Sequence, residues 1–207
     1  MGDRRVAIVT GATAGIGLGI AHELRRLDHT VALVGRDRER GRDAERLLGG
    51  PPHRFFDADA SDEADTRALV PRVIDSFGRL DAIIVNAGGA RRHAPVDSIA
   101  SADWEHTLAV NLSQCFWLVQ AALPHLGPGG RIVLISSVVG RQGRGGMAAY
   151  SAAKHGMIGF ARSLALELGP RSITVNVVCP GLVLTDALDR RVGPGQRYAV
   201  MEDLVDA

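Results

Sequence analysis

The stretch VAIVTGATAGIG, residues 6–17, joins a short apolar run to a turn that contains three glycines. A continuous apolar run of this length is typical of a strand buried on both faces, as in a parallel sheet. In the turn, Gly11 permits a tight bend, Gly15 lets the backbone approach a phosphate, and Gly17 lets a helix pack closely on the strand. The stretch predicts a nucleotide-binding strand–turn–helix unit, because the start of such a helix favours a pyrophosphate. The spacing is G-x-x-x-G-x-G, however, and a turn with three glycines is often only a turn.

The same alternation of short apolar runs and longer amphipathic segments continues along the chain. Strands are predicted at residues 6–9, 30–34, 54–58, 82–85, 131–135 and 173–178, and helices at 15–27, 37–48, 62–77, 102–125 and 149–168. Ser61 is expected to cap the third of these helices. Buried strands separated by helices require crossover connections, so the pattern predicts a doubly wound parallel sheet. This is the Rossmann-like α/β class, with six strands in one domain over residues 1–207.

Composition excludes several kinds of function. The 24 basic and 23 acidic side chains leave a net charge of +1, and aromatic residues are only 4%, so neither nucleic acid nor an acidic membrane is an expected partner. No apolar run approaches the roughly 18 residues of a membrane helix or the core of a secretory signal, which predicts a soluble, cytoplasmic protein. Cys115 and Cys179 lie far apart and the seven histidines are dispersed, so neither a disulfide framework nor a metal site is expected.

The end of the second predicted strand bears on the choice of cofactor. The strand ends in Val34-Gly35-Arg36, and no carboxylate follows until Asp37. An acidic residue there would hold a ribose 2′-hydroxyl, whereas an arginine can pair with a 2′-phosphate. Arg36 therefore predicts NADP(H) in preference to NAD(H), which stays possible. Alternatively, Arg36 is a solvated residue at the start of a helix that carries further arginines.

A phenol and an ammonium are placed on one helix face by Tyr150-Ser151-Ala152-Ala153-Lys154. A free phenol has a pKa of about 10, and a fixed cation beside it favours the phenolate. The pair can then donate or accept a proton at a carbonyl or an alcohol. Lys154 is the single lysine among the 24 basic residues, which suggests a position where arginine does not serve. The alternative is an ordinary surface contact between the two side chains.

Further polar residues follow other predicted strands. Ser137 ends the strand at 131–135, at the edge of the sheet where ligands bind, and its hydroxyl could orient a substrate oxygen. Alone, such a serine is more often a cap or a turn residue. Arg91, Arg92 and His93, and also Arg141 and Arg144, flank the expected site and could select an acidic substrate, or are solvated loop residues.

These motifs together resemble the single-domain branch of the short-chain dehydrogenase/reductase family. The matches run in chain order through Thr10–Gly17, Asp59, Asn86-Ala87-Gly88, Asn111, Ser137, Tyr150 with Lys154, and Pro180-Gly181. The resemblance implies a general acid/base, Tyr150. It implies that Lys154 lowers the pKa of the phenol and binds the nicotinamide ribose, that Ser137 holds the substrate carbonyl, and that Asn111 anchors a water. On the sequence alone, Asn111 is instead a residue that bends a helix.

The resemblance also implies the contacts with the cofactor. The glycine loop would bind it through Gly11, Thr13, Ala14, Gly15, Ile16 and Gly17, with Arg36 beside them. Asp59 and Ala60 would meet the adenine, and Asn86, Ala87 and Gly88 the neighbouring ribose. Pro180, Gly181, Val183 and Thr185 would line the nicotinamide. On the sequence alone, Asp59 is instead a loop cap.

The chain departs from this family after Thr185. Relatives usually continue with a segment that covers the substrate, a further helix and a seventh strand, whereas residues 186–207 predict only a shortened lid and C-terminal segment. The lid is expected to begin within residues 182–191 and a short helix to form at 198–205. With no seventh strand found, the strand at 173–178 is expected to have an exposed edge. A homo-oligomer is expected if the shortened segment permits it.

These observations lead to two functional hypotheses. The first is an NADP(H)-dependent oxidoreductase that interconverts a carbonyl and a secondary alcohol, with Tyr150 as the general acid/base. The second is a truncated, non-catalytic nucleotide-binding or interaction protein. Turnover of a small carbonyl or alcohol substrate distinguishes them.

Overall fold

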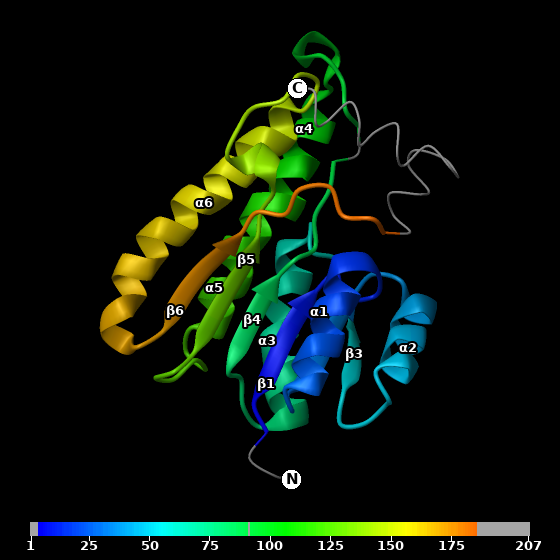
Figure 1. Ribbon diagram of the computed structural model, residues 1–207, viewed down its shortest axis with the longest axis vertical. Coiled ribbons are helices and arrows are strands. Elements are labelled where there is room, and N and C mark those ends of the chain that lie inside the picture. Colours follow the sequence, from blue (N-terminus) through cyan, green and yellow to red (C-terminus); the bar gives the residue numbers. More distant parts are fainter. Residues whose placement is uncertain (1–3, 91, 186–207) are drawn as a thin grey trace.

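One six-stranded parallel sheet organises the computed structural model, which describes residues 4–90 and 92–185 (Figure 1). The spatial order of the strands is β3-β2-β1-β4-β5-β6. They are β1 (Val6–Thr10), β2 (Thr30–Gly35), β3 (Arg54–Asp57), β4 (Ala82–Val85), β5 (Arg131–Ile135) and β6 (Thr174–Val178). The strand order reverses between β1 and β4, so the doubly wound Rossmann-like class is confirmed.

Helices cover the two faces of the sheet. On one face lie α1 (Gly15–Arg26) and α2 (Arg38–Leu47), which bury side chains such as Ala21 and Ala44 against it. On the other lie α3 (Glu63–Phe77), α5 (Gln114–Ala122) and α6 (Ala148–Leu168). Successive residues of a strand point to opposite faces of the sheet. In β1, Ala7 and Val9 therefore pack in the layer of α1 and α2, and Val6 and Ile8 pack in the layer of α3, α5 and α6. Further short elements are α4 (Ser101–Leu108), η1 (Val96–Ser98), η3 (Val138–Gly140) and η4 (Gly169–Arg171).

β6 is less buried than a continuous apolar run predicts. Val175 and Val177 are half-buried against the layer of α6, but Thr174, Asn176 and Val178 on the opposite face are exposed. The reason is that, in the described part of the chain, no helix covers that face over β6. β6 is also the last strand of the described sheet, which agrees with the exposed edge expected for it.

The predicted helix at 102–125 is not continuous. Between α4 and α5 lies a π-helical turn, η2 (Ala109–Ser113). Two amide side chains take carbonyls that a regular helix would use: Asn111 Nδ2 donates to Thr107 O at 2.8 Å, and Gln114 Nε2 donates to Val110 O. This competition for backbone carbonyls accounts for the wide turn.

Two smaller predictions were wrong. Asp62 rather than Ser61 caps α3, since its carboxylate accepts from Asp65 N at 2.9 Å. A carboxylate at a helix start also interacts favourably with the helix dipole, whereas the Ser61 hydroxyl donates to Asp59 instead. Strand β3 ends at Asp57, so Ala58 lies beyond it.

Some predictions fall outside the described residues. These are the short helix at 198–205, most of the expected lid at 182–191, and Arg91. Among the described helices, none is long and apolar enough to cross a membrane.

Candidate active site

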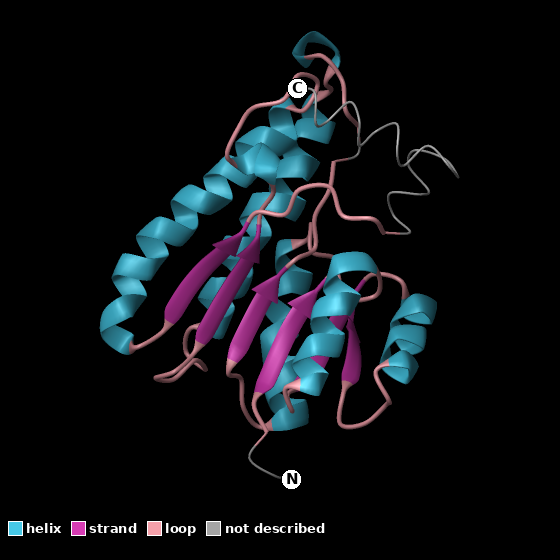
Figure 2. Cartoon of the chain, in the orientation of Figure 1, coloured by secondary structure: helices cyan, strands magenta, loops and turns pink. Residues whose placement is uncertain are grey.

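The predicted site residues gather at the carboxyl ends of the strands. The six strands are parallel and end at this edge of the sheet. Figure 2 shows the loops that follow β4, β5 and β6 at the same edge. Gly11–Gly17 follow β1, Arg36 follows β2, Asp59 and Ala60 follow β3, Asn86–Gly88 follow β4, Ser137 follows β5 and Pro180–Thr185 follow β6. This edge is the ligand-binding edge of an open parallel sheet.

The glycine loop leaves no space for side chains at its ends. A Cβ on Gly17 would lie 2.2 Å from the Gly11 carbonyl oxygen, and one on Gly11 would lie 2.9 Å from Ala87 Cα. Asn86 Nδ2 reaches across from β4 and donates to Thr10 O at 2.9 Å and to Gly11 O at 3.2 Å. The start of α1 is thereby held against β1 and β4, which leaves its N–H groups directed at the open edge.

Gly17→Ala is expected to lower NADPH affinity at least tenfold and to destabilise the fold by about 1–3 kcal/mol, because the new Cβ overlaps backbone atoms. Gly19→Ala is the matched control in the same helix, since a Cβ there meets nothing within 4 Å. That control should bind NADPH normally and gain about 0.5–1 kcal/mol of stability. Fluorescence titration and thermal unfolding measure both quantities, and equal behaviour of the two variants would contradict the close packing.

Arg36 follows β2 at the open edge of the site, and its side chain is loosely held. Its guanidinium is mostly exposed and lies 3.7 Å from the Asp59 carboxylate. Arg38 is engaged more closely, by Asp57 at 2.6 Å. Of these two arginines, Arg36 therefore has the longer and weaker ion pair with a neighbouring carboxylate.

Asp59 caps the loop after β3, and its carboxylate lies beside Arg36. Its Oδ1 accepts from Ser61 N at 2.8 Å and from Ser61 Oγ at 2.7 Å, which is a loop cap. Burial acts to raise the pKa of this carboxyl, but the Ser61 hydrogen bonds and the Arg36 charge lower it overall. A charged acceptor thus lies beside Arg36, where an adenine would be received.

Asn111 is fully buried and holds the loop after β4. Its Nδ2 donates to Gly89 O at 2.6 Å, and its Oδ1 accepts from Gly89 N at 3.0 Å. Gln114, which was not predicted as a site residue, is also fully buried and donates to Ala87 O at 2.5 Å. The one feature of the sequence that could have indicated a role for Gln114 is its position three residues after Asn111, on the same helix face.

Tyr150 and Lys154 face one another as their spacing predicts. Lys154 Nζ lies 5.6 Å from the centre of the Tyr150 ring and donates to Ile135 O at 2.8 Å. A Cβ on Gly88 would lie 3.3 Å from the same nitrogen, so the ammonium also borders the loop after β4. Lys154 is 2% exposed, and burial lowers the pKa of its ammonium from 10.5 to about 8 against the opposing effect of the nearby thiols.

Ser137 is brought to this pair by the packing of β5 against α6. Gly140 makes the approach possible, because a Cβ there would lie 2.8 Å from Lys154 O. The Ser137 hydroxyl accepts from Val139 N at 3.2 Å, so it caps η3, and the residue is half-buried. Its hydroxyl proton remains a donor for a further group.

The segment after β6 crosses the top of the sheet to the glycine loop. Pro180 O accepts from Val138 N at 2.9 Å, and a Cβ on Gly15 would meet the Thr185 side chain at 3.3 Å. Gly181 and Val183 between them are exposed. The segment therefore lies between the loop after β5 and the glycine loop, where it would cover the nicotinamide half of a bound dinucleotide.

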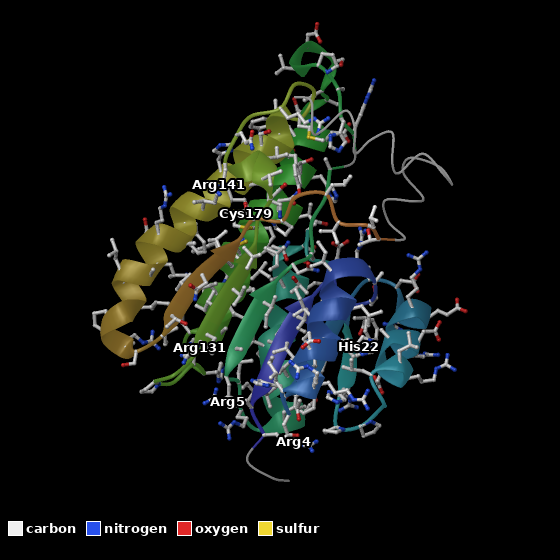
Figure 3. All side chains as sticks on the ribbon, viewed as in Figure 1. Arg4, Arg5, His22, Arg131, Arg141 and Cys179 are labelled. Carbon is white, nitrogen blue, oxygen red and sulfur yellow. The ribbon has the colours of Figure 1, made fainter. Side chains whose placement is uncertain are left out.

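Not every flanking residue lies in the site. Arg141 lines a separate groove of about 590 Å³ along the outer edge of β6, together with Arg162 and Cys179. Figure 3 labels Arg141 and Cys179, which lie near the end of β6. His93, in contrast, lies against Tyr150 with the ring centres 6.5 Å apart. In the described parts of the chain no group of His, Cys, Asp and Glu side chains could hold a metal ion.

Three features come together at this edge of the sheet: a glycine loop after β1, a buried lysine beside a tyrosine on α6, and a serine after β5. This combination is typical of α/β dehydrogenases that use a nucleotide cofactor. The family model described as short chain dehydrogenase matches residues 5–193. The chain belongs to the short-chain dehydrogenase family.

Similar proteins include named enzymes and a complex. D-threitol dehydrogenase of Mycolicibacterium smegmatis is 36% identical over 207 residues, which cover 98% of this chain and 79% of that protein. The 3-oxoacyl-[acyl-carrier-protein] reductase of Escherichia coli is 36% identical over 201 residues, covering 96% and 81%. The structure of a short chain dehydrogenase from Burkholderia cenocepacia in complex with NADP has a TM-score of 0.83 and 38% identity, covering 88% of this chain and 76% of that one.

Proposed function

We propose that this protein is an NADP(H)-dependent oxidoreductase that interconverts a carbonyl and a secondary alcohol. The observation that carries the proposal is the buried Lys154 ammonium below the Tyr150 ring, beside the loop after β4 and at the same edge as the glycine loop. The related threitol dehydrogenase and oxoacyl reductase by name act on hydroxyl and oxo groups, which supports the same chemistry here.

The residues present fit a dinucleotide phosphate. The loop before α1 and the first turn of α1 carry no side chain at Gly11 and Gly17, where a Cβ would overlap backbone atoms. Arg36 would hold the 2′-phosphate, Asp59 and Ala60 would meet the adenine, and Asn86 to Gly88 the adjoining ribose. Thr13, Ala14, Gly15 and Ile16 would surround the pyrophosphate under Thr185, and Pro180, Gly181 and Val183 would cover the nicotinamide.

In the proposed mechanism Tyr150 moves the proton. When bound, NADPH supplies the hydride that reaches the carbonyl carbon. The Tyr150 hydroxyl gives its proton to the carbonyl oxygen in reduction and takes it back in oxidation. The Lys154 cation stabilises the phenolate that results, and the Ser137 hydroxyl donates a hydrogen bond that fixes the substrate oxygen. Asn111 keeps the loop after β4 in place and would anchor a water that returns the proton.

Arg36→Glu is expected to weaken NADPH binding about 10–100-fold and to leave NADH binding within about threefold, because a charge-assisted pair with phosphate is replaced by repulsion. Arg42→Glu is the matched control, since Arg42 is an exposed arginine of α2 that undergoes the same charge change. Fluorescence titrations with both cofactors give the four ratios. Equal losses for NADPH in the two variants would refute the specific assignment of Arg36.

The first direct test is titration of the purified protein with NADPH and NADH, followed by turnover on a panel of carbonyl compounds and secondary alcohols. Micromolar binding with turnover supports the proposal. Absence of both would favour a non-catalytic protein instead. A cytoplasmic location and a homo-oligomer remain predictions from the sequence.

A further inference from the structure

The loop that follows β4 lies between the glycine loop and the proposed catalytic pair. On one side, a Cβ on Gly11 would lie 2.9 Å from Ala87 Cα, so the two loops are in close contact. On the other side, a Cβ on Gly88 would lie 3.3 Å from Lys154 Nζ. The position of this loop therefore sets the distance between the cofactor-binding glycines and the ammonium beside Tyr150.

A buried amide at the start of α5 holds this loop. Gln114 is fully buried, and its Nε2 donates to Ala87 O at 2.5 Å and to Val110 O on the preceding turn. Both partners are carbonyl oxygens, so only the NH2 group of the amide can face them, and the amide oxygen points the other way. There, Gln114 Oε1 accepts from Thr10 Oγ1 over a longer distance of 3.4 Å.

Thr10 closes a ring of hydrogen bonds around Ala87. Its Oγ1 accepts from Asn86 N and from Ala87 N, both at 3.0 Å. Because two N–H groups occupy the acceptor sites of the hydroxyl, its proton is left to donate to Gln114. Ala87 is thus held at its N–H by Thr10 and at its C=O by Gln114, and these two side chains also hold one another. A closed network of this kind orients the peptide more firmly than one contact would.

Gln114 shares this task with Asn111, which lies three residues earlier on the turn η2. Asn111 exchanges two hydrogen bonds with Gly89, at 3.0 and 2.6 Å. The two amides therefore hold the residues on either side of Gly88, which is itself exposed and borders Lys154 Nζ. The mechanism proposed above gives Asn111 a role but gives Gln114 none.

We propose that Gln114 is a positioning residue for the reaction. It keeps Gly88 at its distance from the Lys154 ammonium and keeps Ala87 against the glycine loop, without itself touching the substrate. This inference rests on the proposed function, because that function gives Lys154 and the loop after β4 their tasks. Loss of the Gln114 amide should then lower the turnover of the folded protein and not only its stability.

The test uses two variants that remove the amide and one matched control. Gln114→Met keeps the length and approximate volume of the side chain, and Gln114→Ala leaves space instead. Thr107→Val is the control, because it removes a buried hydroxyl that donates to Asp103 O at 2.6 Å in the same helical stretch. The backbone carbonyl of Thr107, to which Asn111 donates, is unchanged in this control.

Both Gln114 variants are expected to lower kcat about 10–100-fold at saturating NADPH and to raise the Kd of NADPH about tenfold. The KM of the carbonyl substrate should stay within about threefold of the wild type, since Tyr150 and Ser137 are unchanged. Thr107→Val should lose a similar few degrees of melting temperature, while its kcat and NADPH Kd stay within about twofold of the wild type. The carbonyl probe is ethyl acetoacetate, or the panel compound that the wild type reduces fastest, and rates are divided by the folded fraction from circular dichroism.

A double-mutant cycle adds a readout that overall stability does not move. Thr10→Val removes the other support of the Ala87 peptide. Because both side chains act on one peptide, the loss of kcat in the double variant should be smaller than the product of the two single losses. Losses that multiply would mean that Thr10 and Gln114 do not act as one unit, which contradicts the inference.

Three further results would overturn the inference while leaving the proposed function intact. One is wild-type kcat and NADPH affinity in folded Gln114→Met, which would limit the amide to a role in stability. Another is an equal loss of kcat in Thr107→Val, which would trace the effect to general loosening of the helix. The third is failure of both Gln114 variants to fold, which would make the residue structural. Absence of turnover in the wild type on the whole panel would instead refute the proposed function, and with it this inference.

Discussion

Tyr150→Phe is expected to lower kcat by about 10³-fold while NADPH affinity stays within about twofold of the wild type. The variant loses only the phenolic oxygen and keeps the ring that packs between Lys154 and His93. Proton transfer to the substrate oxygen then has no donor, whereas the glycine loop and Arg36 are untouched. Steady-state kinetics and a fluorescence titration on the same preparation measure the two quantities.

Ser151→Ala is the control for Tyr150→Phe. It removes a hydroxyl from the next residue of α6, whose oxygen is buried and has no hydrogen-bond partner among the described residues. Its kcat should stay within about twofold of wild type, since no interaction is lost. If Tyr150→Phe retained wild-type turnover, or lost NADPH binding with its fold intact, the division of labour between phenol and glycine loop would be wrong.

Lys154→Arg and Lys154→Met are both expected to lower kcat/KM at least about 100-fold, although only the second removes the charge. The ammonium lies in a small space between Ile135 O and Gly88, and a planar guanidinium would have to displace one of them. Kinetics with a saturating cofactor concentration measure the loss. Full activity of Lys154→Arg would show that the site needs only a positive charge, and the absence of other lysines from the chain would then carry no information.

Lys154→Met should also separate activity from stability. In the cofactor-free protein, burial lowers the pKa of the Lys154 ammonium to about 8, against 10.5 for an exposed lysine. Below pH 8 folding buries a charged ammonium, so Lys154→Met should raise the unfolding free energy by about 2 kcal/mol after the loss of the hydrogen bond to Ile135. Between pH 8 and 10.5 the folded wild type becomes neutral while the unfolded chain stays charged, so this advantage should shrink as the pH rises.

Denaturant unfolding at pH 7 and pH 10 measures the difference in stability between the wild type and Lys154→Met. A difference that is the same at both pH values would mean that burial of the charge is not its source. A difference that grows with pH would contradict the lowered pKa directly.

The sequence was sufficient for the features that depend on local pattern. The sheet class, the approximate strand positions and most of the helix positions follow from short buried runs separated by amphipathic segments, whereas the break in the helix at 102–125 does not. The shared face of Tyr150 and Lys154 follows from helical periodicity alone. These features need no knowledge of which segments touch.

The features that the sequence did not predict depend on contacts between segments. The exposure of Asn176 and Val178 in β6 is set by what covers the strand, which its own residues do not encode. Gln114 acts through its hydrogen bond to Ala87, which lies 27 residues away in the sequence. Ser61 and Asp62 are adjacent, and both residue types are favourable helix caps, so the sequence pattern does not decide which of them caps α3.

The wide turn η2 also makes the length of this helical stretch matter as much as its composition. A π-helical turn holds one residue more than an α-helical turn, so deleting a single residue between 109 and 113 would allow a regular helix to form. The whole of α5 would keep nearly the same orientation relative to α4, because the shorter regular turn covers almost the same rotation, and Cys115, Leu118 and Val119 would stay in the core. The backbone N–H groups of that turn would instead take the Thr107 and Val110 carbonyls from the Asn111 and Gln114 side chains. A deletion of one residue at this turn should therefore leave the core intact and disturb only the side chains that hold the loop after β4, whereas a deletion within α4 or α5 should turn the residues beyond it by about 100° and move them out of the core.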